Sequence, residues 1–247
     1  MKSFTPAEIE SLVQGGAHLR RILAAVAQMV KPGVSGIELN AAAEKLIAAA
    51  GAKPAFKGYG QPPYPNALCV SINDCVVHGI AQQQPLKQGD IVSLDCGIEY
   101  QGLFTDAATT IPVGKISARA SDLIATAKKS LDLAVKTLRA GITTGDLGAT
   151  VQAFVEQQGF AVVREYTGHG VGHLVHDDPP IPNFGQPGQG VRLTLGMVIA
   201  IEPMITAGDW KVRVRDNQWD VVTVDGSLAA HFEHTVVITS DGCRVLT

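Results

Sequence analysis

The spacing of apolar and polar positions predicts a pair of helices at the start of the chain. Residues 5–8 (Thr-Pro-Ala-Glu) form a capping box with proline at the first helical position, and the amphipathic pattern that they open continues to about Val30. A second capping box at residues 35–38 opens an alanine-rich segment that stops at Gly51, where glycine suits a left-handed cap. Two consecutive helices are therefore expected.

The same pattern then starts again further along the chain. Short β-rich runs follow the first helices at residues 68–72, 91–99 and 103–111. Helical periodicity returns at 117–139, closed by Gly141, and at about 144–158, closed by Gly159. Further strands are predicted at 197–202, 219–224 and 232–239.

Two helices followed by strands, twice over, indicate a structural duplication, although the halves share no residue-level repeat. We predict an α+β fold in which helices cover a curved, mostly antiparallel sheet. The 247 residues are expected to form one domain with pseudo-symmetric halves at about 1–112 and 113–247.

Composition and charge narrow the functional classes. Hydrophobic residues make up 46% of the chain and the net charge is −3, with no long basic run, so no nucleic-acid or membrane partner is predicted. Residues 1–6 lack the apolar core of a signal peptide, and no apolar run approaches the ~18 residues of a membrane span. Four scattered cysteines suggest reduced thiols. We expect a cytoplasmic monomer.

Two acidic residues lie on neighbouring strands. In the strand 91–99, Asp95 faces away from the apolar side that carries Val92 and Leu94. If the following turn centres on residues 100–101, Asp106 pairs directly with Asp95 and their Cβ atoms lie ~5 Å apart. Ionised carboxylates this close repel, so they need a shared proton, a basic neighbour or a cation. On this pair alone, a cation and a different register, with one Asp facing solvent, stay equally open.

Two further clusters carry groups that bind metals. Residues 167–176 hold three histidines, including His169 among glycines that let the backbone approach a ligand, and His176. Glu202 and Glu233 adjoin almost wholly apolar strands, where an unpaired charge is costly. A lone histidine or carboxylate in such a place is commonly structural. Four carboxylates, two in each half of a duplicated chain, favour a shared cation.

Five motifs follow one another along the chain. They are residues 71–74 leading to His78 and Gly79, the pair Asp95 and Asp106, residues 168–172 with His176, residues 201–204, and residues 232–235. In order and spacing they resemble the methionine aminopeptidases, within the pita-bread fold family, over essentially the whole chain. The chain shows no long insertion between His176 and Glu202 and no zinc-binding N-terminal extension, which points to the short bacterial kind, type I.

The resemblance implies an activity and a set of metal ligands. The family removes the initiator methionine from nascent proteins when the second residue is small. Its two divalent ions, Co, Mn, Fe or Zn, would be held by Asp95, Asp106, His169, Glu202 and Glu233. Asp95 would bind one ion, Asp106 and Glu233 would bridge both, and His169 with Glu202 would complete the other.

The resemblance also implies a mechanism. Two ions ~3.5–4 Å apart can share a water and lower its pKa, so that a bridging hydroxide attacks the first peptide bond. Glu202 is the candidate general base. His176 would stabilise the tetrahedral intermediate, and His78 would contact the scissile amide nitrogen. Since the substrate's free α-amine would sit on one metal, the expected partners are N-termini of nascent polypeptides, met for instance at the ribosome.

By the same resemblance, four residues would line the methionine pocket: Tyr59, Tyr64, Cys69 and Trp219. Aromatic rings and a small thiol suit a thioether side chain, although they are equally at home in an ordinary core.

Three positions depart from the family pattern. Thr167, Val175 and His231 stand where Cys, a bulkier residue and Gln are frequent, and they could retune the substrate range or ligand orientation.

Two other readings use the same fold. A prolidase or Xaa-Pro aminopeptidase generally has an additional N-terminal domain, whereas here only about 65 residues precede the first strand. A catalytically inactive binding paralogue usually loses metal ligands, whereas this chain keeps all of them. Both readings are therefore disfavoured.

Overall fold

A computed structural model describes residues 4–247. The first predicted helical pair is present as α1 (Pro6–Ala27) and α2 (Gly36–Ala49), each with the expected capping box at Thr5 and Ser35. Gly51 follows α2 at φ +70°, as predicted. The absence of a signal peptide was predicted partly from residues 1–3, which lie outside the described part. None of the helices within residues 4–247 is long and apolar enough to cross a membrane.

The second helical pair, α3 (Ala118–Thr137) and α4 (Thr144–Gln157), also lies where the pattern predicted it. Gly159 follows α4 at φ +76° and its N–H donates to the carbonyl of Glu156. Gly141 does not close α3, contrary to prediction. That helix ends because Leu138 is extended, and the N–H of Gly141 donates to the carbonyl of Leu193.

Antiparallel strands build one large sheet and two small ones within the described residues. The large sheet runs β1-β4-β5-β14-β9-β7-β8, with β2 added to β4 and β15 added to β14, and the small sheets run β13-β10-β6 and β11-β12-β3. Their bounds are β1 (Lys53–Pro54), β2 (Cys69–Ile72), β3 (Cys75–Val77), β4 (Ile91–Tyr100), β5 (Leu103–Pro112), β6 (Ala161–Val162), β7 (Gly168–Gly170), β8 (Asp177–Ile181), β9 (Val198–Ile201), β10 (Met204–Thr206), β11 (Val212–Val214), β12 (Val221–Thr223), β13 (Ala229–His231), β14 (Glu233–Ile238) and β15 (Cys243–Val245).

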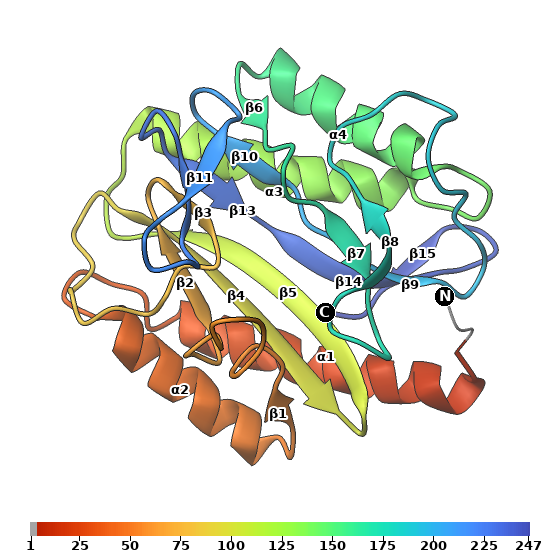
Figure 1. The fold of residues 1–247 in the computed structure, drawn as a ribbon, viewed down its shortest axis with the longest axis horizontal. Helices are drawn as coiled ribbons and strands as arrows, with labels where there is room; N and C mark the ends of the chain where they lie inside the picture. The colour runs from red at the N-terminus through yellow and green to blue at the C-terminus, as the bar shows by residue number, and fades with distance from the viewer. Residues whose placement is uncertain (1–3) are drawn as a thin grey trace.

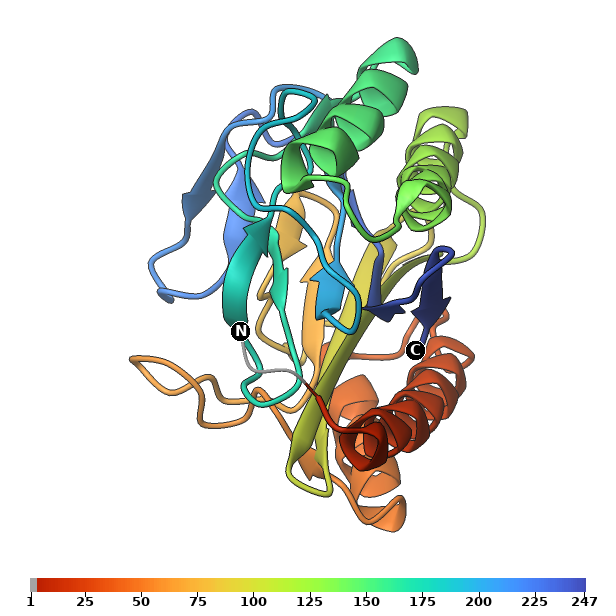
Figure 2. The same ribbon diagram turned by 90° about the vertical axis from the view of Figure 1, so that its right-hand side faces the viewer.

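The two helical pairs cover the sheet side by side, α1 and α2 over β4 and β5, and α3 and α4 over the second half (Figures 1 and 2). The apolar face of β4, with Val92 and Leu94, is buried against α1 and α2, and Ile199 and Ile201 of β9 are buried with α3 and α4. The predicted α+β fold, two helices and strands repeated, is thus confirmed.

The predicted register of the hairpin between β4 and β5 is wrong by two residues. Asp95 pairs with Ala108, and Asp106 pairs with Gly97. The turn centres on Gln101 and Gly102, both at positive φ, rather than on residues 100–101. Because side chains alternate between faces with a period of two, the shift leaves both carboxylates on the same face as diagonal neighbours.

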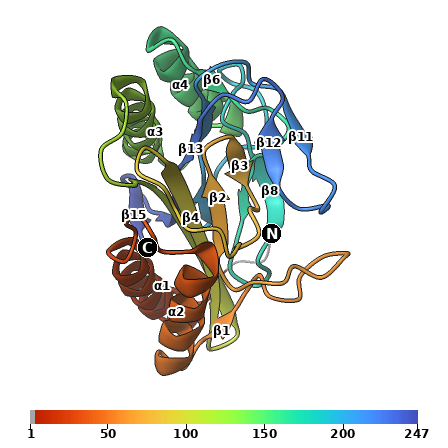
Figure 3. The same ribbon diagram turned by 90° about the vertical axis from the view of Figure 1, so that its left-hand side faces the viewer.

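One small sheet joins the two halves of the chain. Strand β3 comes from the first half and pairs with β12 from the second, with Val77 opposite Val221 (Figure 3). The predicted strand 219–224 is shorter than expected, because Trp219 lies in the turn that precedes β12. This pairing brings Trp219 close to His78, which directly follows β3.

Candidate metal centre

All five predicted metal ligands meet on one side of the large sheet. Asp95 is on β4, Asp106 on β5, His169 on β7, Glu202 just after β9, and Glu233 at the start of β14. Three overlapping groups each have ligand atoms within 4.8 Å of one another: Asp95, Asp106 and Glu233; His169, Glu202 and Glu233; and Asp106, His169 and His176. The convergence joins residues from both halves of the chain.

The carboxylates of this cluster are buried together without counter-charge. Asp95, Asp106 and Glu233 are 8%, 2% and 2% exposed. Burial raises the pKa of Asp106 to about 7, and burial together with the neighbouring Asp106 charge raises the pKa of Asp95, Glu202 and Glu233 well above the usual range.

Two oxygens in the cluster, Oδ1 of Asp95 and Oε1 of Glu233, are buried and have no hydrogen-bond partner among the described residues. Such groups are costly in a folded protein unless a cation or proton meets them. The oxygen-rich donor set therefore fits divalent cations.

His169 is oriented as a ligand histidine. Its Nδ1 lies 2.9 Å from the carbonyl of Gly170, which only accepts, so Nδ1 carries the proton and Nε2 keeps its lone pair. Nε2 lies 3.5 Å from Oε1 of Glu202. Burial, and then the nearby His176, lower the pKa of His169 to about 4, so the ring is neutral near pH 7 and able to bind a metal.

His231, one of the three departures from the family pattern, contacts a predicted ligand. It is 1% exposed, and its Nε2 lies 3.5 Å from Oε2 of Glu202. Neither ring nitrogen has a hydrogen-bond partner in the described chain, and burial lowers the pKa of His231 to about 3. Glu202 thus lies between two neutral imidazoles, His169 and His231.

A cavity of about 190 Å³ opens beside the carboxylates. The predicted catalytic histidines and pocket residues all line it: His78, His176, Tyr59, Tyr64, Cys69 and Trp219. Tyr64, Cys69 and Val175 form a buried apolar cluster, against which Trp219 packs. Thr167 also lines the cavity, so each of the three departures lies at the pocket or beside a ligand.

The two catalytic candidates line the cavity beside different aromatic neighbours. His78 has the uncommon φ of +60°, and its ring lies 6.1 Å from that of Trp219 and 5.6 Å from that of Tyr166. Burial, followed by His176, lowers the pKa of His78 to about 4. The exposed His176 lies 4.5 Å from the His169 ring and 5.1 Å from the Tyr59 ring, measured between centroids.

Sequence reasoning missed four residues that line the same cavity: Phe56, Val77, Tyr166 and Met204. One of them had left a signal in the sequence. Gly97 is a glycine inside a strand, which often marks a close approach, and a Cβ there would lie 2.7 Å from the ring of Phe56.

Buried carboxylates and a neutral imidazole beside an apolar cavity are typical of the active site of a metal-dependent hydrolase. Comparison with family models agrees, because residues 10–240 match metallopeptidase family M24. The chain belongs to this family.

Its relatives include full-length proteins named methionine aminopeptidase. One from Clostridium perfringens is 43% identical over 97% of this chain and 96% of its own length. Methionine aminopeptidase 1 of Bacillus subtilis is 42% identical over 98% of this chain and 97% of its own length. The crystal structure of methionine aminopeptidase from Thermotoga maritima superposes with a TM-score of 0.97 at 44% identity, covering 100% of this chain and 99% of that one. The resemblance inferred from the motifs is confirmed.

Prolidases share the fold at lower similarity. The prolidase of Pyrococcus furiosus matches with a TM-score of 0.81 at 24% identity, and 65% of that chain is covered. This likeness concerns the fold alone.

Proposed function

We propose that this chain is a metal-dependent methionine aminopeptidase, which removes methionine from the N-termini of polypeptides whose second residue is small. The observation that carries the proposal is the meeting of Asp95, Asp106, His169, Glu202 and Glu233 beside an apolar cavity. The full-length relatives of that name support the same activity. The prolidase reading has weaker support, because those relatives resemble the chain in fold only.

The overlapping ligand groups favour two cations rather than one. Glu233 belongs both to the group with Asp95 and Asp106 and to the group with His169 and Glu202. A carboxylate has two oxygens and can serve two ions at once. The mixture of carboxylates and one imidazole suits Mn, Fe, Co or Zn.

The residues around the cations divide the catalytic work. When bound, divalent cations supply an activated water near neutral pH and polarise the scissile carbonyl. The Glu202 carboxylate, which lines the cavity beside the other acidic residues, would take up the water's proton. His176 would donate to the oxygen of the attacked carbonyl, and His78, which also lines the cavity, would contact the leaving nitrogen.

The apolar end of the cavity suits a methionine side chain. Tyr64 packs edge-on against Trp219 with ring centroids 5.0 Å apart, and Cys69 is buried beside them. Aromatic edges and sulfur make favourable contacts with a thioether. Tyr59 and His176 also line the cavity, and their rings contact each other with centroids 5.1 Å apart.

The setting of this activity also belongs to the proposal. Nascent chains present new N-terminal methionines in the cytoplasm, where the enzyme would act on them at or near the ribosome as a monomer. The four free cysteines, three of them buried, are compatible with a reducing compartment.

The proposal is tested by removing metal with a chelator, restoring single divalent metals, and assaying Met-Gly-type and Xaa-Pro peptides side by side. We expect hydrolysis of the methionyl peptides to be lost on stripping and restored by at least one metal. Equal hydrolysis without metal, or cleavage of proline substrates alone, would contradict the assignment.

A further inference from the structure

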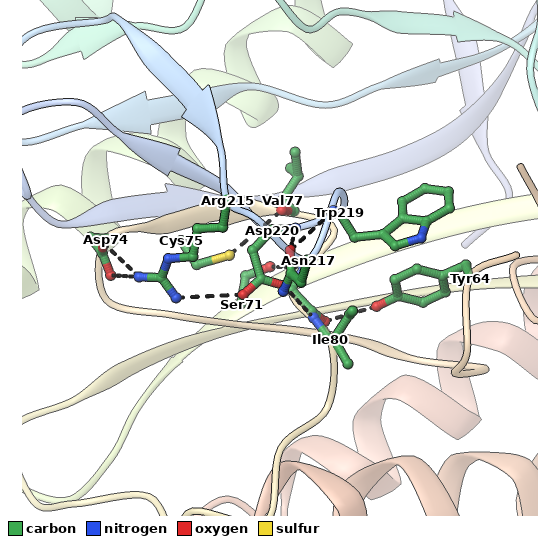
Figure 4. Close-up of polar contacts among 11 residues, drawn as sticks. Tyr64, Ser71, Asp74, Cys75, Val77, Ile80, Arg215, Asn217, Trp219 and Asp220 are labelled. Carbon is green, nitrogen blue, oxygen red and sulfur yellow. Dashed lines mark hydrogen bonds and ion pairs between the residues drawn. The ribbon is translucent and has the colours of Figure 1, made fainter. Parts of the chain in front are cut away.

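An ionic network lies next to the segment that carries Trp219, one of the residues that line the cavity (Figure 4). The guanidinium of Arg215 donates to both carboxylate oxygens of Asp74, at 2.9 and 3.1 Å, and lies 3.4 Å from Oδ2 of Asp220. The other oxygen of Asp220 accepts the backbone N–H of Ile80 at 2.9 Å. Asp220 is 2% exposed, so Arg215 is the counter-charge for a buried carboxylate.

The network ties together the two segments that carry Trp219 and His78. Arg215 and Asp220 close the turn between β11 and β12, since the N–H of Arg215 donates to the carbonyl of Asp220. Trp219 is the residue before Asp220. Asp74 and Ile80 lie on either side of His78 in the sequence. A single guanidinium therefore connects the turn from the second half of the chain to the loop from the first.

Both segments adopt backbone conformations that need external support. His78 has φ +60° and Gln218, next to Trp219, has φ +66°. Residues other than glycine persist there only where their surroundings over-determine the backbone. Asn217 provides part of this support, because its Oδ1 accepts the N–H groups of Trp219 and Asp220.

The neighbouring loop is held in a similar way. The Tyr64 hydroxyl donates to the carbonyl of Gly79, and the Ser71 hydroxyl accepts the N–H of Gly79. The ring of Trp219 packs so closely over Gly60 that a Cβ there would lie 2.6 Å from it. A small displacement of Trp219 would therefore change the shape of the pocket.

We propose that Arg215 is a positioning residue: by bridging Asp74 and Asp220 it fixes Trp219 and His78 relative to each other, and so sets the selectivity for methionine. The selectivity part rests on the proposed aminopeptidase function, whereas the positioning of Trp219 does not.

A purely stabilising role for these ion pairs is the alternative, and for the pair with Asp74 the exposure of the groups argues against it. The side chains of Arg215 and Asp74 are 38% and 30% exposed, and pairs with such access to water contribute little to the stability of a whole fold. Loss of Arg215 also leaves the buried carboxylate of Asp220 without its counter-charge, which lowers global stability. The positioning role is therefore separated from the stabilising one by measuring pocket shape and selectivity beside Tm.

The structural test uses the fluorescence of Trp219. The chain has two tryptophans, so W210F leaves Trp219 as the sole reporter. In that background, Arg215→Met should raise the acrylamide quenching constant of Trp219 about twofold, because the turn opens more often. Arg213→Met, at an exposed position in the same hairpin, is the matched control and should leave quenching unchanged.

The kinetic test uses the metal-loaded enzyme. We expect Arg215→Met to lower kcat/KM on a methionyl peptide about tenfold and to reduce the preference for methionyl over alanyl peptides, whereas Arg213→Met stays within about twofold of wild type. Arg215→Lys should recover part of the loss, because lysine keeps the charge but has no second nitrogen with which to contact Asp74 and Asp220 separately.

Each outcome decides one claim. Unchanged quenching and selectivity in a folded Arg215→Met variant would overturn the proposal, as would a fall in kcat/KM that follows a lowered Tm while selectivity stays the same. If the wild type cleaves no methionyl peptide, the proposed function fails, and the quenching comparison still decides whether Arg215 positions Trp219.

Discussion

Replacing Asp106 by asparagine is expected to stabilise the metal-free protein while it removes a proposed metal ligand. The carboxyl of Asp106 is buried among three others, and it pairs with no basic side chain in the described chain. Its side chain accepts the N–H of Ala107 through Oδ1 at 2.9 Å, a hydrogen bond that the asparagine carbonyl can keep. The substitution therefore removes the charge with little change in shape.

The magnitude follows from the pKa of Asp106, which burial raises from 3.8 to about 7. Because the folded-state pKa lies above the unfolded one, the native state binds the proton more tightly. This contribution to stability is complete below pH ~4 and is lost as the pH rises through ~7. A shift from 3.8 to about 7 corresponds to about 4 kcal/mol in total, of which more than half falls between pH 5 and 8.

The same charge also acts on its neighbours. Asp106 raises the pKa of Asp95, Glu202 and Glu233, after burial itself. Removing the Asp106 charge should lower those pKa values, and the stability of the metal-free protein should then depend even less on pH.

The assay is urea unfolding of chelator-stripped wild type and Asp106→Asn at pH 5 and pH 8, with Asp122→Asn on the exposed face of α3 as the control. The wild type and the control should lose stability as the pH rises, and Asp106→Asn should lose less and be the most stable of the three at pH 8. An Asp106→Asn variant that is destabilised at pH 8, or that keeps the wild-type pH dependence, would refute the reasoning.

Three further predictions concern single side chains. Glu202→Gln should abolish turnover while circular dichroism shows an intact fold, and full activity would exclude Glu202 as the general base. His78→Ala and His176→Ala should each lower kcat by about 10²-fold or more with metal content unchanged by elemental analysis, and loss of metal would make them ligands instead. His231→Leu should weaken metal binding in calorimetry by about 10-fold, because Glu202 loses its neighbour, whereas His231→Gln should keep most of the affinity; equal affinities in both variants would remove His231 from the support of Glu202.

Most of the helices and strands could be predicted from local signals in the sequence. A capping box is formed by side chains three residues apart, so Thr5, Ser35 and their helices could be located from the sequence alone. The turn between β4 and β5 lies one residue further along the chain than predicted, at Gln101 and Gly102. A glycine at the second turn position favours the tight hairpin centre that the structure shows.

The five-residue cluster was predicted from the resemblance of five motifs to the methionine aminopeptidases, whereas its surroundings depend on contacts between distant segments. Asp95 and Asp106 stay on one face even when the register shifts by two, which made that prediction robust. Phe56 and Tyr166 reach the cavity from loops, and the Arg215 bridge joins residues 141 positions apart. Contacts between residues so far apart in the sequence leave no periodic pattern from which they could be predicted.

The convergence of the acidic residues on bound cations is tested most directly by anomalous diffraction from crystals of the cobalt-loaded protein. Two anomalous peaks are expected among Asp95, Asp106, His169, Glu202 and Glu233, at metal-ligand distances of about 2.0–2.3 Å. Peaks located elsewhere, or no peak among these five side chains at saturating cobalt, would contradict it.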